Sequence, residues 1–89
     1  MFVSGALTLA NAAEALREGS AELTQGVHTV DLSEVGELDS SALALLLAWL
    51  RVAKRLGSDL AFANLPQGLT TIARLYGVAE LLPAPPAHH

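Results

Sequence analysis

The sequence has no cysteine, little aromatic content and few charges. Without cysteine, the chain cannot form disulfide bonds, thiolate metal sites or a cysteine nucleophile. Aromatic residues make up only 4% of the chain, so leucine and alanine must build most of the core. A small secreted domain often needs disulfides, and the first residues lack the basic start and long apolar run of a secretory signal. We therefore expect a cytoplasmic protein.

Long hydrophobic runs and excess positive charge are also missing. The longest apolar run, residues 42–50, has nine residues and is followed by Arg51, Lys54 and Arg55. A membrane-spanning helix needs about 20 predominantly apolar residues, so this run predicts a core helix. The net charge of −4 does not favour binding to the phosphate backbone of nucleic acids.

What is present is enough for one small domain. The chain has 89 residues, of which 52% are hydrophobic. We expect a single domain over residues 1–82. Residues 83–89, "PAPPAHH", predict a disordered tail, in which we interpret His88 and His89 as the remnant of an affinity tag.

Hydrophobic periodicity and turn residues predict alternating strands and helices. Strands are expected at residues 2–3, 27–32 and 59–64, and helices at 9–23, 40–56 and 67–76. Thr8 is the expected N-cap of the first helix, and Gly19 predicts a break or kink within it. The side chains expected to face the core from the strands are Val30, Leu32, Leu60 and Phe62. This order predicts an α/β fold, β-α-β-α-β-α, with about three helices on a small, mostly parallel sheet.

The central helix carries two apolar stripes. Asp39 is the expected N-cap of this helix, and Gly57 is its expected C′ residue. A loop is predicted at residues 35–39, directly before the helix. One stripe should pack on the sheet: Leu43, Leu46, Leu47 and Leu50. The second lies nearly opposite: Ala42, Leu45, Trp49 and Val52. Either neighbouring helices and the tail cover the second stripe, or it is a partner surface with Trp49 as its anchor.

The loop "DLSEVGELDSS" is the candidate site. Parallel sheets place binding sites where loops leave the carboxyl ends of strands, and helix N-termini can receive phosphate. A phosphate on Ser41 would be favoured by the helix dipole but opposed by Asp39 and Glu37. The alternative interpretation is that Ser40 and Ser41 only cap the helix, and the residues alone favour it.

Enzyme chemistry is not indicated. No nucleophile-elbow motif surrounds Ser40 or Ser41, and His28 falls in the middle of a predicted strand. There is no P-loop and no cluster of metal-ligand residues with suitable spacing. We therefore predict a non-enzyme with no catalytic, cofactor-binding or metal-binding residues.

Two segments resemble the STAS domain family, which includes the anti-sigma-factor antagonists. They are "VDLSEVGELDSSALALLLAWLRVAKRLG" and "LAFANLPQGLTTIARLYGVAELL", and the likeness extends over nearly the whole chain. The resemblance implies a STAS fold. Because the N-terminus is shorter than the family pattern by about one strand, we expect the sheet to lack the usual first strand, with strand exchange in a homodimer as one way to complete it.

Within the family, "LTLANA", "LALLL" and "IARLYGV" resemble the small subunit of a bacterial phospholipid ABC transporter. That resemblance implies a non-catalytic protein that binds the ATPase subunit, and through it the permease, on the inner membrane. The complex would move phospholipids between the inner and outer membranes and maintain lipid asymmetry. Ser40 matches a threonine at the centre of the ATPase contact. The expected interface is Glu37, Asp39, Ser40, Ser41, Ala42, Leu45 and Trp49.

The alternative within the family is an anti-sigma-factor antagonist controlled by phosphorylation. Ser41 matches the serine that is phosphorylated in the sporulation-type antagonists. Those proteins usually have glycine at the next position, where this chain has Ala42. The partner would then be an anti-sigma factor with kinase activity.

Overall fold

The computed structural model describes residues 2–23 and 26–84, so the prediction for the tail with His88 and His89 lies largely outside the described residues. The elements follow one another as β1 (Phe2–Leu7), α1 (Leu9–Glu22), β2 (Gly26–Leu38), α2 (Ser40–Leu56), β3 (Ser58–Ala63), α3 (Gln67–Leu75) and the short 3-10 helix η1 (Ala79–Leu81). The predicted α/β class and β-α-β-α-β-α order are confirmed.

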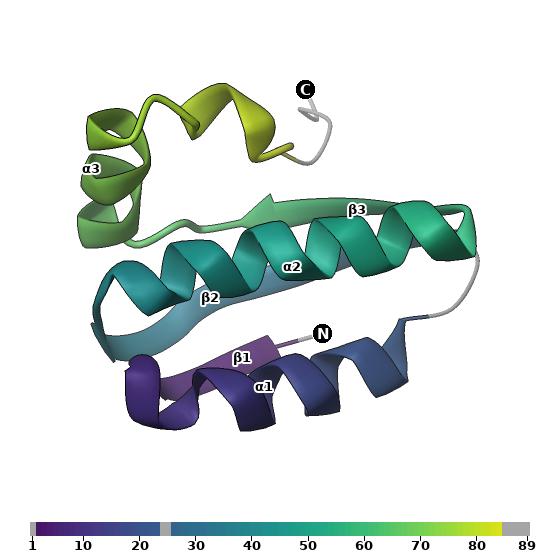
Figure 1. Cartoon of the computed structure of the whole chain (residues 1–89), viewed down its shortest axis with the longest axis horizontal. Helices are drawn as coiled ribbons and strands as arrows, with labels where there is room; N and C mark the ends of the chain where they lie inside the picture. Colours follow the sequence, from purple (N-terminus) through teal and green to yellow (C-terminus); the bar gives the residue numbers. More distant parts are fainter. Residues whose placement is uncertain (1, 24–25, 85–89) are drawn as a thin grey trace.

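The three strands form a parallel sheet in the order β1-β2-β3. Figure 1 shows α1 and α2 side by side on one face of this sheet. Two successive right-handed crossovers in the same direction produce this arrangement. On the strands, Thr29, Ser33 and Asp59 are exposed and alternate with buried residues. Because the strands are parallel, all three end at the same edge of the sheet, and the next helix starts from that edge.

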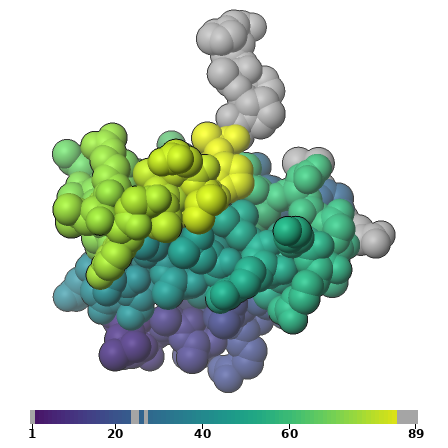
Figure 2. Space-filling model, turned by 45° about the horizontal axis from the view of Figure 1, so that its top comes forward, coloured from purple at the N-terminus to yellow at the C-terminus, as the bar shows by residue number. Residues whose placement is uncertain are grey.

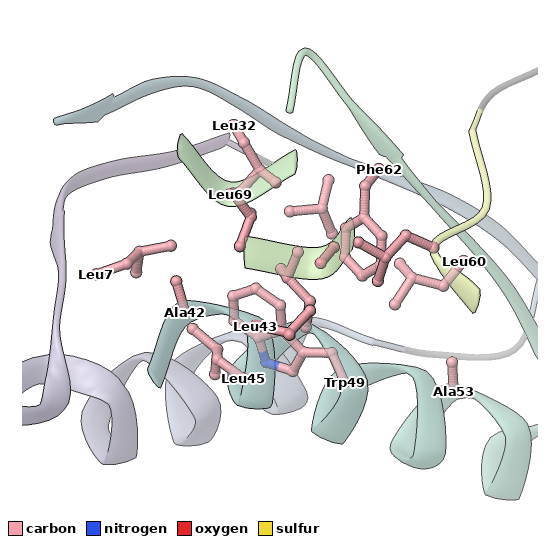
Figure 3. Packing of buried hydrophobic residues seen from close by; sticks show 14 of the residues in the cluster. Leu7, Leu32, Ala42, Leu43, Leu45, Trp49, Ala53, Leu60, Phe62 and Leu69 are labelled. Atoms are coloured by element: carbon pink, nitrogen blue, oxygen red, sulfur yellow. The ribbon is translucent and has the colours of Figure 1, made fainter. Parts of the chain in front are cut away.

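The core lies between the sheet and α2. Val30, Leu32, Leu60 and Phe62 are at most 6% exposed, which confirms the predicted inward positions on the strands. In Figure 3, side chains from the strands approach those of α2, with Leu69 of α3 beside them. Leu46 of α2 is completely buried. Aliphatic side chains thus supply most of the buried volume, as the composition requires.

The predicted break at Gly19 is wrong, because α1 is continuous from Leu9 to Glu22. Gly19 is buried where α1 passes over the indole of Trp49. A Cβ at this position would lie 2.5 Å from two carbons of that ring. The indole Nε1 also donates a hydrogen bond of 3.3 Å to the Leu16 carbonyl oxygen. The glycine is therefore a site of close helix packing.

The second apolar stripe of α2 is covered within the chain. Ala42, Leu45 and Trp49 are at most 3% exposed, and α1 packs along this side of α2. The interpretation of these three residues as a partner surface is therefore wrong for the folded chain. Pro83 lies at β3, where the Phe62 amide donates a 2.8 Å hydrogen bond to the Pro83 carbonyl oxygen.

The ends of α2 follow the prediction, but the preceding loop does not. Asp39 caps the N-terminus and Gly57 ends the helix with a φ of 69°. Residues 35–38, predicted as loop, extend β2 because they pair with β1, for example Gly5 with Val35. Within the described residues, no helix is both long enough and apolar enough to cross a bilayer.

Candidate partner interface

The candidate site lies where β1 and β2 end side by side. Leu7 pairs with Leu38 in the parallel register, and the Asp39 amide donates a 3.3 Å hydrogen bond to the Leu7 carbonyl. The turns into α1 and α2 therefore start from adjacent points. This is the strand edge at which α/β folds commonly bind ligands and partners.

One carboxylate caps both helices. Asp39 Oδ1 accepts a 2.8 Å hydrogen bond from the Ser41 amide at the start of α2. Asp39 Oδ2 accepts a 3.1 Å hydrogen bond from the Leu9 amide at the start of α1. Thr8, the predicted N-cap of α1, makes no side-chain capping hydrogen bond. Asp39 thus fixes the position of one helix start relative to the other.

These hydrogen bonds stabilise the ionised form of Asp39. The Ser41 amide is the main cause that lowers the pKa of this carboxyl below its usual 3.8, and the Leu9 amide adds to the effect. An ionised carboxylate at two helix N-termini also interacts favourably with both helix dipoles. The half-buried Asp39 therefore makes the site anionic at neutral pH, and Glu37 beside it carries an exposed carboxyl group.

We call Leu9, Glu37, Asp39, Ser40 and Ser41 the α2 tip. Glu37 and Ser40 are exposed, whereas Asp39 and Ser41 are half-buried. The structure therefore brings together four of the residues expected in the interface. The other three, Ala42, Leu45 and Trp49, belong to the core.

Leu9 was missed as a surface residue. It is 78% exposed and lies beside the Asp39 cap. As the first residue of α1, it has no preceding turn to pack against. Its position directly after the predicted N-cap was the available signal. An exposed leucine gives the tip an apolar contact point between polar groups.

The geometry does not assemble a Ser-His site from the serines considered above. His28 lies near the start of β2, whereas Ser40 and Ser41 follow its other end. Ten residues of strand between His28 and Leu38 span about 30 Å, far beyond hydrogen-bond reach. What the tip can provide is a fixed, partly apolar contact surface.

Comparison with known proteins assigns the family. Residues 1–83 match the family described as "Mlab, STAS domain". Two curated relatives are the intermembrane phospholipid transport system binding proteins MlaB of Escherichia coli (strain K12) and of Shigella flexneri. Each is 35% identical over 63 residues, which cover 70% of this chain but only 65% of the relative. The chain belongs to the MlaB-type STAS domain family.

Proposed function

We propose that the chain is a non-catalytic subunit of a phospholipid-transporting ABC system and that it binds the ATPase subunit through the α2 tip. Its place would be the cytoplasmic side of the inner membrane, held there by the transporter complex. The similarity to proteins named for intermembrane phospholipid transport supports the transport role. The choice of the ATPase as partner rests on the family resemblance of the segment that contains Ser40.

The double cap at Asp39 is the structural observation that carries the proposal. A contact surface formed by two helix starts would lose affinity if the starts moved independently, because binding would then have to order them. Hydrogen bonds of 2.8 Å and 3.1 Å from one carboxylate link the two starts before any partner arrives. Leu9 and Ser40, on either side of this carboxylate, are exposed and available for contact.

The proposal is tested by co-expressing the chain with the ATPase subunit encoded in the same genome. A tag on the ATPase is used for purification, and the amount of co-purified chain is measured. Ser40→Asp should reduce it strongly. An acid at the first position of α2 is favourable for the helix itself, so a loss of binding would report on the interface. Ser41→Asp should also weaken binding, since it adds charge beside Asp39.

A matched pair tests the apolar contact. Leu9 and Leu75 are 78% and 80% exposed, but Leu75 lies at the C-terminal end of α3, seven positions beyond Gly68, the α3 residue that lies beside Leu38. Leu9→Gln should reduce co-purification, whereas Leu75→Gln should not. Equal recovery of both variants with the wild type would argue against the tip. Stoichiometric phosphorylation of Ser41 by a partner kinase, without ATPase binding, would instead indicate the anti-sigma-factor antagonist.

A further inference from the structure

A second surface lies along the groove between α1 and α2. The groove has a volume of about 970 Å³. Its lining comes from one side of each helix: Ala13, Leu16, Arg17, Ser20, Ala48, Arg51, Val52, Lys54 and Arg55. In Figure 2, α2 (teal) crosses the middle of the molecule, with α1 (purple to blue) along one side of it. The groove is separate from the α2 tip, because its first α2 residue lies eight positions, or about 12 Å, beyond Ser40.

The charge around this groove is opposite to that of the chain. The chain has a net charge of −4 and only five lysine and arginine residues. Four of the five line the groove, and none of the carboxylates in residues 2–23 and 26–84 does. All four, Arg17, Arg51, Lys54 and Arg55, are exposed. The acidic residues of α1 lie on its other side, where Glu14, Glu18 and Glu22 border β1. The groove is therefore a local positive region.

The floor of the groove is apolar and made of small or aliphatic side chains. Leu16, Ala48 and Val52 are half-buried, and Ala13 is exposed. Along α1 the lining runs from Ala13 to Ser20, seven positions that correspond to about 10 Å of helix. That length matches about two turns of a third helix packed against the pair, and grooves between helices commonly accept an amphipathic helix in this way.

We propose that this groove binds a short amphipathic helix with acidic flanks, supplied by a protein partner. Its apolar face would contact Leu16, Ala48 and Val52, and its carboxylates would pair with the cations on both rims. Arginine supplies three of these cations and can pair with a carboxylate through two parallel hydrogen bonds. A concave floor of small side chains fits a convex helix, whereas insertion into a bilayer would require protruding apolar side chains. A second copy is disfavoured because two chains of the same net charge repel each other.

The test uses two synthetic helical peptides with the same leucine and alanine face. One has glutamate on both flanks and the other has lysine. Each is titrated into the isotopically labelled chain, and amide chemical shifts are followed by NMR. The acidic peptide should bind with shifts concentrated on the lining residues of the groove, and the basic peptide should bind at least about tenfold more weakly, since attractions become repulsions.

Two variants locate the site. The double substitution Arg51→Glu/Arg55→Glu should weaken binding of the acidic peptide about tenfold or more. The matched control is Arg74→Glu, which reverses the charge of the fifth lysine or arginine of the sequence, on α3 and not among the lining residues, and should leave binding unchanged. Circular dichroism of each variant checks that the fold is retained. Raising the salt concentration should weaken binding of the acidic peptide, because exposed charges are screened.

Three results would overturn the proposal. The first is absence of binding, or equal binding of both peptides. The second is binding of phosphatidylglycerol vesicles that depends on Arg51 and Arg55, which would identify a membrane-surface site. The third is a dimer in analytical ultracentrifugation that the double substitution dissociates, which would identify a second copy as the occupant. None of these measurements uses the ATPase subunit. Their results are therefore independent of whether the α2 tip binds that subunit.

Discussion

The contact between Gly19 and Trp49 predicts a change in the free energy of unfolding for Gly19→Ala that is opposite in sign to the change expected from helix propensity. Replacing a glycine in a helix interior with alanine normally stabilises a protein by about 1 kcal/mol. Gly19 lies in the continuous helix α1, so propensity alone predicts that Gly19→Ala raises the free energy of unfolding. We predict instead that this substitution lowers it.

The reason is the space beside Gly19. A Cβ there would meet three atoms of the Trp49 ring at 2.5–2.6 Å. The ring is 1% exposed and its Nε1 is hydrogen-bonded to α1, so it cannot move aside without disturbing the core. Overpacking of this kind costs about 1–3 kcal/mol. Taking the upper part of that range and subtracting the propensity gain leaves a net loss of about 1–2 kcal/mol.

The assay is thermal unfolding followed by circular dichroism, with urea unfolding as a second measure. For a domain of this size, the expected loss lowers Tm by about 5–15 °C. The control is Glu18→Ala, the exposed neighbour, which should change stability by no more than about 0.5 kcal/mol. Trp49→Phe shortens the ring system, so the double variant should be more stable than the sum of the two single effects. A Tm for Gly19→Ala equal to or above that of the wild type would refute the reasoning.

Three further predictions concern capping and packing. Amide hydrogen bonds lower the folded-state pKa of Asp39, so its stabilisation is complete above about pH 4 and is lost as the pH falls through the lowered pKa. The difference in urea midpoint between wild type and Asp39→Asn should therefore shrink below about pH 4, and a difference that does not vary with pH would contradict this cause. Gly57 has a φ of 69° with open space around it, so Gly57→Ala should cost about 1 kcal/mol in urea unfolding through backbone strain alone. Leu46 is fully buried, and Leu46→Ala should cost about 2–5 kcal/mol by the same assay, whereas a cost below about 1 kcal/mol would argue against its packing.

Local features of the fold could be predicted from sequence. The ends of α2 were predicted correctly because Asp39 and Gly57 act within one turn of the helix they limit. The inward positions of Val30 and Phe62 follow from strand alternation. These assignments depend on neighbours in the chain, and no tertiary contact was needed to make them.

Contacts between distant residues could not be predicted in the same way. From the sequence, Gly19 predicted a break in α1. Its actual role depends on its contact with Trp49, which lies thirty positions away in the chain. Likewise, Asp39 was expected to cap one helix, and only the pairing of β1 with β2 brings its second oxygen to Leu9. The serines were located correctly at a strand-to-helix turn, but Leu9 lies beside them only because β1 pairs with β2. The turn between β2 and α2 was thus predicted from neighbouring residues, whereas the approach of α1 to it was not.

The most direct test of the proposed function is complex formation between the purified chain and the purified ATPase subunit. Size-exclusion chromatography with light scattering measures the mass of the complex. We predict a stable complex of defined stoichiometry for the wild type and for Leu75→Gln, and its loss for Ser40→Asp and Leu9→Gln. No complex with the wild type, or an undiminished complex with both tip variants, would contradict the proposal that the α2 tip binds this partner.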